Sequence, residues 1–497
     1  MVMNKSRHAI IIGSGVAGMA LSVRLAASGY SVHVLEANDY PGGKISMFEK
    51  DGYRFDAGPS LFTQPEQIEA LFQLAGKPIE KYFSYVQSDV VCHYFFDNGK
   101  RLKTYADQQL LAEEFEKVLG EKKQTVLNYL ADAERLYEKV GTIFLNHSLH
   151  DKSTWLHKRV FGALKTVRWY HLFQTMNRFN ETRFRSKEAV QLFNRFATYN
   201  GSNPYKAPAM LTLIPHLEQN QGTYYPKGGM ISITNALYQL ATDLGVRFSF
   251  GRKAEKIIHD KQGVKGVVAG GELMPADLVT SNGDVYYTYQ HLLQDKTKSE
   301  RIEKMERSSS AIIFYWGINR SFRELGLHNI FFTGDYQSEF SGLFDTKQLW
   351  HDPTVYINIT AKMEAGHAPD GCENWFVMVN APEHNGQDWA KISLELRERI
   401  IQKLSAQLGV NLCDHIVTEL TLDPSGISNR THTYKGSLYG TSSNAKMAAF
   451  FRPPNYSSAI HGLYFCGGTV HPGGGIPLSL KSAEIVASMI DKKYGRQ

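Results

Sequence analysis

The chain has 497 residues, a formal net charge of +6, 42% hydrophobic residues and 21% charged residues. These values are ordinary for a soluble globular protein, and the length predicts several domains around a large core. No apolar stretch approaches the roughly 18–20 residues that a membrane span needs. The four cysteines are scattered without a C-x-x-C pair, which argues against a disulfide framework or a structural zinc site and favours a reducing compartment.

The N-terminal segment reads as strand, glycine turn, helix and strand. The apolar run "HAIII" precedes "GSGVAG" (13–18), a helical pattern follows from Met19 to Ala27, and the β-branched run "SVHVLE" ends at Glu36. A basic start before an apolar run imitates a secretory signal peptide, but the glycines interrupt that run at fixed spacing. We therefore interpret the segment as folded structure that binds a dinucleotide.

Each glycine of this turn has a physical role in such a site. Gly13 permits the tight turn, Gly15 lets a pyrophosphate approach the backbone, and Gly18 lets helix and strand pack closely. The helix N-terminus then faces the phosphates with its free N–H groups. Glu36 is placed to accept hydrogen bonds from ribose hydroxyls and disfavours a 2′-phosphate. The candidate cofactor contacts here are Gly13, Gly15, Val16, Ala17, Gly18, Glu36 and Ala37.

The next turns favour FAD over NAD. A nicotinamide enzyme would proceed to another helix after the acidic residue, whereas this chain continues with Gly42-Gly43-Lys44 and then "FDAGPS" (55–60). The first is a glycine turn with a cation suited to phosphate, and the second is a further turn. Two unrelated surface turns are the alternative.

This pattern resembles the two-dinucleotide-binding-domain flavoproteins, which include amine oxidases, Rab GDP-dissociation inhibitors and bacterial-type carotenoid desaturases. The resemblance places Gly42, Gly43 and Lys44 at the ADP half of FAD and Gly58, Pro59 and Ser60 near the flavin. The segment 197–237, with "SNP", "APA" and "YPKGGM", resembles the carotenoid desaturases in particular. It implies FAD as the cofactor, with the backbone near Ala254 meeting the adenine.

The C-terminal run "LYFCGGTVHPGGGIPLSLKSAE" (463–484) completes the resemblance. In the family, Gly467 and Gly468 form a turn after a strand, and the helix start at Ile476, Pro477 and Leu478 covers the isoalloxazine edge. The two glycine-rich turns would thus hold one FAD at opposite ends. Leu478 departs from the glycine that carotenoid desaturases commonly carry, which predicts a narrower pocket and an altered regiochemistry. Cys466 is interpreted as a buried apolar residue rather than a covalent flavin anchor.

The resemblance implies an α/β fold: a Rossmann-like FAD-binding domain, a mixed-sheet substrate domain and a helical, membrane-facing subdomain. The expected boundaries are 1–80 with 222–300 and 455–497 for the first, 81–110 with 301–454 for the second, and 111–221 for the third. The run "SSSAIIFYWGINR" (308–320) alternates like a strand of the substrate sheet. Its aromatic residues Phe314, Tyr315 and Trp316 could line a substrate tunnel or belong to the core.

Residues 151–190 combine nine Lys or Arg residues with only three acids and with interleaved aromatic and leucine residues. This pattern is typical of a helix that lies on a membrane surface. A helix that packs an apolar stripe on the core and exposes its cations is the alternative. No DNA- or RNA-binding module accompanies the charges, so nucleic acid is not an expected partner.

The resemblance implies a hydrophobic C40 carotenoid substrate and a desaturation that transfers a hydride from the polyene end region to flavin N5 and then loses a proton. A hydrocarbon C–H is far less acidic than any side chain, so the enzyme's main task is placement. No metal site is expected and no catalytic acid or base is assigned; Asp284, His461 and His471 are polar residues in family-like segments without a defined role.

The chain looks most like the Bacteroidetes-type 1′-hydroxycarotenoid 3,4-desaturases. Phytoene desaturase, carotenoid isomerase or ketolase, amine oxidase and non-enzymatic lipid escort are the alternatives. No second G-x-G-x-x-G appears, so oxygen or a membrane quinone is the expected electron acceptor rather than a resident nicotinamide. The expected location is the cytoplasm, with peripheral attachment to the inner face of the cell membrane.

Overall fold

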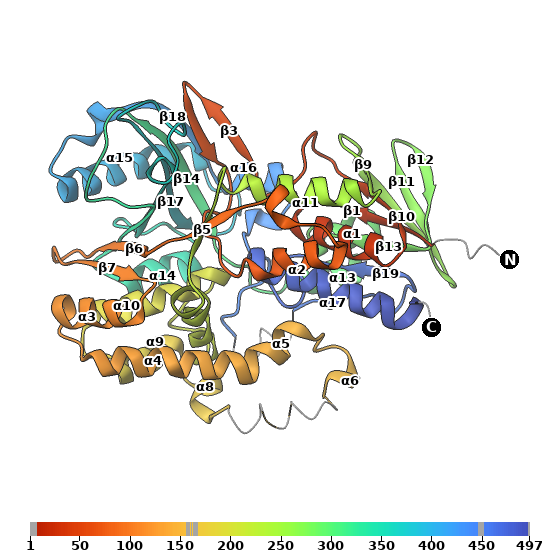
Figure 1. The fold of residues 1–497 in the computed structure, drawn as a ribbon, viewed down its shortest axis with the longest axis horizontal. Coiled ribbons are helices and arrows are strands. Elements are labelled where there is room, and N and C mark those ends of the chain that lie inside the picture. The colour runs from red at the N-terminus through yellow and green to blue at the C-terminus, as the bar shows by residue number, and fades with distance from the viewer. Residues whose placement is uncertain (1–6, 156–159, 161, 163–166, 446–451, 496–497) are drawn as a thin grey trace.

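The computed structural model describes residues 7–155, 160, 162, 167–445 and 452–495. They form three layers of structure around separate apolar cores (Figure 1). A parallel sheet with its helices lies on the N-terminal side, a larger sheet lies beside it, and a layer of helices lies below both. Among the described helices, none is both long and apolar enough to cross a bilayer.

The first layer is a five-stranded parallel sheet in the order β19-β13-β1-β2-β9. Its strands are β1 (His8–Ile12), β2 (Ser31–Leu35), β9 (Arg247–Ser249), β13 (Leu278–Ser281) and β19 (Leu463–Phe465). Its helices are α1 (Val16–Ala27), α2 (Glu66–Ala75), α11 (Ile231–Asp243) and α17 (Ile476–Tyr494). The predicted strand–turn–helix–strand unit is therefore present, and the C-terminal strand joins the same sheet.

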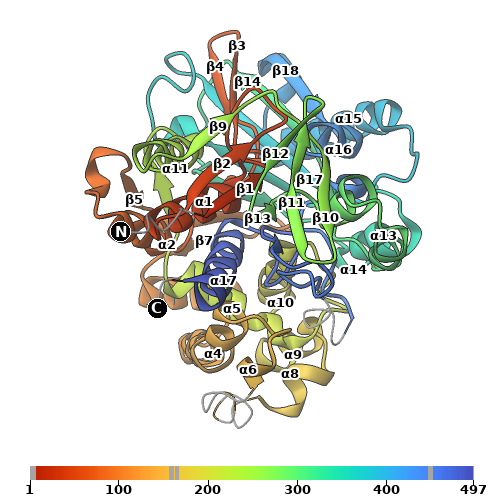
Figure 2. The ribbon, with the colours of Figure 1, turned by 90° about the vertical axis from the view of Figure 1, so that its right-hand side faces the viewer.

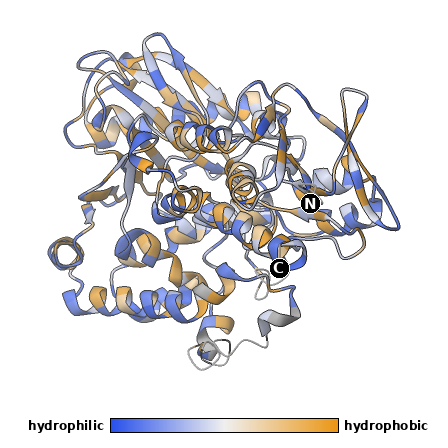
Figure 3. Cartoon of the chain, turned by 45° about the vertical axis from the view of Figure 1, so that its right-hand side comes forward, coloured by the Kyte–Doolittle hydropathy of each residue, from blue (hydrophilic) through white to orange (hydrophobic). Residues whose placement is uncertain are grey.

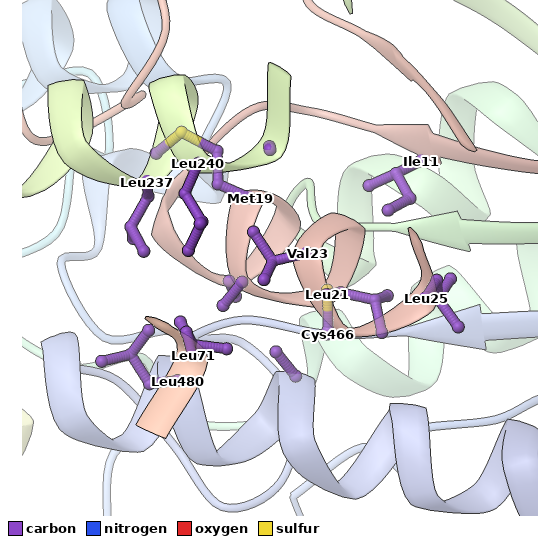
Figure 4. Packing of buried hydrophobic residues seen from close by; sticks show 14 of the residues in the cluster. Ile11, Met19, Leu21, Val23, Leu25, Leu71, Leu237, Leu240, Cys466 and Leu480 are labelled. Atoms are coloured by element: carbon purple, nitrogen blue, oxygen red, sulfur yellow. The ribbon is translucent and has the colours of Figure 1, made fainter. Parts of the chain in front are cut away.

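Helix α1 is apolar on nearly every side because it lies in the middle of this layer. Its residues Met19, Leu21, Val23 and Leu25 are buried against side chains from α2, α11 and α17 (Figure 4). A helix surrounded in this way needs apolar residues all round rather than one stripe. The packing fixes the position of the glycine turn that precedes α1.

A three-stranded antiparallel sheet, β10-β11-β12, stands at one side of the parallel sheet (Figure 2). Its strands are β10 (Ala254–Asp260), β11 (Gly263–Ala269) and β12 (Glu272–Pro275). The hairpin β3 (Met47–Lys50) and β4 (Tyr53–Asp56) leads from the parallel sheet toward the larger sheet, and β5 (Tyr85–Gln87) pairs with β8 (Tyr224–Pro226).

The larger sheet is mixed, in the order β18-β14-β17-β16-β15-β6-β7. Its strands are β6 (Val90–Phe95), β7 (Arg101–Tyr105), β14 (Ser310–Ile318), β15 (His328–Phe331), β16 (Val355–Ile359), β17 (Glu373–Ala381) and β18 (Ile416–Leu422). Strands β6 and β7 come from an earlier part of the chain, and β6 runs parallel to β15.

The two faces of this sheet settle the roles of the aromatic run in β14. Phe314 and Trp316 are buried in the core that α15 (Trp389–Leu408) covers. Tyr315 points to the opposite face, where its ring lies 4.9 Å from the ring of Phe48. Because side chains alternate along a strand, only Tyr315 faces the side of the sheet that adjoins the parallel-sheet layer.

The third layer consists of helices. They are α3 (Gln108–Leu119), α4 (Lys123–Leu136), α5 (Thr142–Asn146), α6 (Lys152–Trp155), α8 (Trp169–Phe173), α9 (Met176–Arg183) and α10 (Lys187–Asn194). Hydrophilic and hydrophobic residues are interspersed along them (Figure 3), as expected for helices with one buried face. Shorter helices lie elsewhere in the chain: α12 (Val285–Tyr287), α13 (Lys296–Glu303), α14 (Tyr336–Ser341) and α16 (Pro424–Thr431).

Candidate functional site

The carboxyl ends of the parallel strands bring the predicted cofactor residues to one edge of the sheet. Gly13 follows β1, Glu36 follows β2, and Gly467 lies two residues after β19. Ligands of open parallel sheets bind outside these carboxyl ends. Residues from both ends of the chain therefore meet in one site.

The N-terminal turn has the close packing that requires glycine. Gly13 has a φ of +97°, and a Cβ on Gly18 would lie 2.2 Å from the Gly13 carbonyl oxygen. Gly15 is the N-cap residue of α1 and has no side chain to cap the helix, and the first turn, starting at Val16 and Ala17, contains no acidic residue. The N–H groups of a first helical turn have no intrahelical partners, so this end of α1 can accept an anion.

The Glu36 carboxylate is buried and anchors the turn. One oxygen accepts hydrogen bonds from the Ser14 backbone N–H (2.7 Å) and the Ser14 hydroxyl (2.8 Å), and the other accepts from the Asn38 backbone N–H (2.9 Å). A carboxylate offers about four acceptor positions, so one position on the second oxygen stays open for a ribose hydroxyl. Ala37 is partly exposed beside it.

The two turns that follow pack on the first turn and on each other. The Gly42 N–H donates to the Ser14 carbonyl oxygen (3.0 Å), and a Cβ on Gly43 would lie 3.5 Å from the Gly15 Cα. A Cβ on Gly58 would lie 1.8 Å from the Lys44 carbonyl oxygen, so only glycine fits there. Pro59 and Ser60 follow, both partly exposed.

The ammonium group of Lys44 is bonded to the protein backbone rather than left free for a phosphate. Its ammonium group donates a hydrogen bond to the Leu438 carbonyl oxygen (2.7 Å). Burial lowers the pKa of Lys44 to about 8, a shift that the Asp284 carboxylate opposes and the Arg307 charge reinforces. The lysine therefore ties the glycine turn to the backbone at Leu438 and feels the charges of the buried Arg307–Asp284 ion pair, whose N–O distance is 3.1 Å.

The C-terminal turn is also packed so closely that its glycines have little room for a side chain. A Cβ on Gly467 would lie 2.7 Å from the Asn282 side chain, and a Cβ on Gly468 would lie 3.1 Å from the Gly474 Cα. Gly475 has a φ of +101° and begins α17 without a side-chain cap. The first residues of α17 are Ile476, Pro477 and Leu478; Ile476 is buried and the other two are partly exposed.

Asn282 links the two glycine turns and is not among the cofactor residues predicted from the sequence. Its side-chain oxygen, oriented by the hydrogen-bond network, accepts from the N–H groups of Gly15 (3.1 Å) and Gly18 (3.2 Å). The same amide lies directly against Gly467. The sequence did show a polar residue directly after a predicted strand. It did not show the strand order, in which β13 lies between β1 and β19 and so brings Asn282 between the two glycine turns.

Ala254 lies at the start of β10, close to the Glu36 end of the site. The Arg252 N–H donates to the Glu36 carbonyl oxygen (2.8 Å), and Lys253 lies over the Tyr287 ring. A cavity of about 260 Å³ opens there; it is lined by Tyr286, Tyr287, His291, Ser428, Asn429, His432, Thr433, Tyr434 and Lys435. The cavity is large enough for an aromatic ring and lies on the same side of the site as the Glu36 carboxylate.

These features fit a long dinucleotide. Two helix N-termini with glycine as the N-cap residue, glycine turns without space for side chains and one buried carboxylate with an open acceptor position lie along one edge. Among the described residues, no group of three or more His, Cys, Asp or Glu side chains is arranged to hold a metal ion.

The other polar residues near the C-terminal turn show no catalytic arrangement. Asp284 is engaged with Arg307, and His461 is exposed. His471 is buried, its Nε2 lies 3.0 Å from the His147 carbonyl oxygen, and burial lowers its pKa to about 4. Cys466 is packed in the core beside α1 (Figure 4), and burial raises the pKa of its thiol.

The chain belongs to the flavin containing amine oxidoreductase family, whose model matches residues 16–490. The protein is therefore an FAD-dependent oxidoreductase with the α/β fold of this family. A 1-hydroxycarotenoid 3,4-desaturase from Flavobacterium sp. (strain P99-3) is 45% identical over 97% of this chain and 99% of its own length. A 4,4′-diapolycopene oxygenase from Methylomonas sp. is 30% identical over 99% of both chains.

Solved structures share the fold at low sequence identity. An oxidoreductase from Methanosarcina mazei superposes with a TM-score of 0.65 at 14% identity, covering 98% of this chain and 100% of its own. Putrescine oxidase bound to putrescine gives a TM-score of 0.62 at 14% identity, covering 98% of this chain and 99% of its own.

Proposed function

We propose that this chain is a carotenoid desaturase that introduces a C=C bond near the end of an end-hydroxylated C40 polyene. The observation that carries the proposal is the 45% identity with a 1-hydroxycarotenoid 3,4-desaturase over nearly the full length of both chains. The glycine turns and the Glu36 carboxylate, which would hold FAD, are intact in this chain. That arrangement supports an enzyme over a lipid escort without catalysis.

We further propose which residues hold the cofactor. Gly13, Gly15, Val16, Ala17 and Gly18 would bind the pyrophosphate, Glu36 and Ala37 the ribose, and the backbone at Ala254 the adenine. The Gly42–Lys44 turn would contact the ADP half of FAD. The Gly58–Ser60 turn, Gly467, Gly468 and the α17 start at Ile476, Pro477 and Leu478 would position the flavin end. Bound FAD supplies the acceptor for a hydride from the substrate.

The chain's own part in the reaction is placement. On the side of the large sheet that adjoins the parallel-sheet layer, Tyr315, Phe376 and Ile313 are buried in an apolar and aromatic cluster with residues of β4, and this cluster would form one wall of the substrate site. Such a surface orients a hydrocarbon and excludes water, and correct placement of the reacting carbon can supply much of the rate enhancement. Leu478, partly exposed at the start of α17, would narrow the space beside the flavin.

The proposed domain division follows the sheets. The parallel sheet and β10–β12 would form the FAD-binding domain (1–80, 222–300 and 455–497), and the mixed sheet the substrate domain (81–110 and 301–454). The pairing of β6 with β15 supports the assignment of 81–110 to the second domain. Residues 111–221 would form the helical subdomain.

We also propose that the helical subdomain contacts the inner face of the cell membrane. Part of the predicted segment 151–190 lies outside the described residues. Within the described part, Met176 and Phe179 are buried in the core, so α9 packs its apolar side inward. Trp155 and Phe173 are 46% and 62% exposed. Their exposure supports a membrane contact at α6 and α8, and a water-insoluble substrate would enter there.

We propose that oxygen or a quinone reoxidises the cofactor.

The testing experiment is an anaerobic single turnover. Purified holoenzyme is mixed with liposomes that carry a carotenoid with or without a terminal hydroxyl, and the flavin and polyene absorbances are followed together. Flavin bleaching with a red-shifted polyene, greater for the hydroxylated compound, is expected. A polyene change with oxidised flavin would indicate isomerisation, and no change in either would contradict the proposal.

The oxygenase relatives define the second candidate. Diapolycopene and diaponeurosporene oxygenases are 30% and 32% identical over 99% of this chain. An aerobic reaction under ¹⁸O₂ distinguishes the two activities by product mass. Label in the carotenoid would favour oxygenation, whereas a product that has lost two hydrogens without gaining label supports desaturation.

A further inference from the structure

A line of buried polar side chains begins at the turn proposed to lie beside the flavin. The Ser60 hydroxyl is 2.8 Å from the Tyr356 hydroxyl, which is 2.8 Å from Nδ1 of His328. Tyr356 pairs with Ile330, and Ile330 pairs with Tyr94 across β16, β15 and β6. Since paired residues share a face of the sheet, Tyr94, His328 and Tyr356 all project to the same side.

An arginine from the helical layer meets these residues. Arg195 forms an ion pair with Glu218 (2.8 Å) and donates to the Tyr199 hydroxyl (2.9 Å), which in turn donates to Glu218. Its guanidinium carbon is 5.4 Å from the centre of the Tyr94 ring. Burial opposes the charge, but Glu218 raises the pKa of Arg195 well above its usual range, so the guanidinium keeps its charge, which the Glu218 carboxylate matches across the ion pair.

Three donors in this group lack a nitrogen or oxygen partner in the described structure. They are the Tyr94 hydroxyl, Nε of Arg195 and Nε2 of His328, all buried. The Asn358 amide nitrogen lies 3.3 Å from Nδ1 of His328 and donates to it, which places the imidazole hydrogen on Nε2. Burial and the Arg195 charge lower the pKa of His328 to about 3, so the ring is neutral.

Unpartnered buried donors are costly for a protein on its own, and here they collect beside the proposed reaction site. They call for an oxygen acceptor that carries no net charge, because the Arg195–Glu218 pair is already neutral and a buried ionised ligand would need a counter-ion. An alcohol oxygen meets both conditions. A carotenoid polyene without a hydroxyl offers no acceptor.

We propose that the buried polar cluster (Tyr94, Arg195, Glu218, His328 and Tyr356) binds the hydroxyl group at the end of the carotenoid, with Tyr94 and His328 donating to its oxygen. This inference rests on the proposed function and names the determinant of its substrate preference. In a 1-hydroxy, 3,4-desaturated carotenoid the hydroxyl lies two carbons from the bond that changes. Its binding site must therefore adjoin the hydride acceptor, and the Ser60–Tyr356–His328 connection places the cluster there.

The test is the substrate preference of Tyr94→Phe holoenzyme. The Tyr94 hydroxyl has no nitrogen or oxygen partner and only the neighbouring Cys92 thiol as a weak one, so its removal should leave the thermal midpoint nearly unchanged. We expect the ratio of kcat/KM for hydroxylated over non-hydroxylated carotenoid to fall about 10- to 100-fold, because a site that hydrogen-bonds a substrate hydroxyl discriminates through those bonds. The loss should fall on the hydroxylated substrate alone.

Two further variants separate binding from folding. His328→Leu should lower the same ratio, and His328→Gln, which keeps a side-chain donor, should restore part of it. Tyr129→Phe is the matched control: it removes a buried tyrosine hydroxyl that donates to Asn180 (2.9 Å) in the helical layer, so it should lower the thermal midpoint and leave the ratio unchanged.

The outcomes are distinguishable. An unchanged ratio in folded, FAD-loaded Tyr94→Phe and His328→Leu overturns the inference. Wild-type protein that oxidises both carotenoids equally overturns the inference and leaves the desaturase activity standing. Wild-type protein that oxidises neither carotenoid overturns the proposed function, and the inference with it.

Discussion

Asn282 makes a contact that should be sensitive to charge at the centre of the proposed cofactor site. Its amide oxygen accepts from the N–H groups of Gly15 and Gly18, where the pyrophosphate would lie close by. Asn282→Asp keeps an acceptor of the same size, and a carboxylate is favourable at a helix N-terminus. It also places a negative charge next to the phosphates. We expect unchanged apoprotein stability and a loss of FAD affinity of at least about tenfold, which corresponds to about 1.4 kcal/mol.

The measurement is titration of apoprotein with FAD, followed by quenching of flavin fluorescence, together with urea unfolding of the apoprotein. Asn282→Ala is the comparison: it leaves two buried N–H groups without their acceptor and should destabilise the apoprotein by about 1–3 kcal/mol. Equal FAD affinity in wild type and Asn282→Asp would show that the amide lies away from the phosphates.

At the scale of the element, the start of α1 depends on how closely it approaches β1. A Cβ on Gly18 would lie 2.2 Å from the Gly13 carbonyl oxygen, which is backbone and cannot rotate away. Gly18→Ala should therefore displace the helix start, lower the free energy of unfolding by about 1–3 kcal/mol and reduce the FAD content of purified protein. Differential scanning fluorimetry and the 450 nm to 280 nm absorbance ratio measure both effects.

Gly283→Ala is the matched control for this variant. Gly283 lies at the same edge of the sheet, and a Cβ there would meet only ordinary contacts, the nearest at 3.6 Å from the Ser281 hydroxyl. It should retain FAD. If Gly18→Ala also retains full FAD content and stability, close packing at this turn is not what requires glycine.

Elements built from neighbouring residues could be predicted from the sequence, and their arrangement in space could not. The β1–α1–β2 unit is local: its strand, glycine turn, helix and Glu36 lie within one continuous segment, so spacing alone indicates it. The run 314–316 shows the limit. Alternation predicted a strand, but which face meets α15 depends on its pairing with β17 and β18.

The same limit applies to the residues proposed to recognise the substrate. Arg195 begins a short 3₁₀ helix (Arg195–Asn200) after α10, and His328 and Tyr94 come from two strands that are far apart in the chain. Each has an unremarkable sequence context. Only the parallel pairing of β6 with β15 and the packing of the helical layer bring them together. A family resemblance could supply the cofactor turns because those are contiguous motifs.

For the whole molecule, the sheet order explains why both ends of the chain are needed for one cofactor. Strands β1 and β19 both pair with β13, so the N-terminal and C-terminal turns become neighbours only when the complete chain has folded. The helical layer lies at the end of the molecule opposite to the β3–β4 hairpin, and α6 and α8 lie at its outer edge (Figures 1 and 2). Substrate entry from a membrane would use this edge.

This placement predicts separable effects on membrane binding and on chemistry. Trp155→Ser combined with Phe173→Ser removes two exposed aromatic side chains from that edge. Burying one large apolar side chain is worth about 1.5–3 kcal/mol, so we expect at least about a tenfold loss of binding to anionic liposomes in a flotation assay. Turnover of carotenoid in liposomes should fall with it, whereas turnover of detergent-solubilised carotenoid and FAD content should not change.

Leu394→Ser combined with Val417→Ser is the control, because these residues are 67% and 53% exposed on α15 and β18, in the large-sheet layer above the helices. Equal liposome binding by both double variants would place the membrane contact elsewhere. A loss of detergent-phase turnover in the Trp155/Phe173 variant would instead show that these residues support the fold of the helical layer, since membrane access cannot limit a reaction in which no membrane is present.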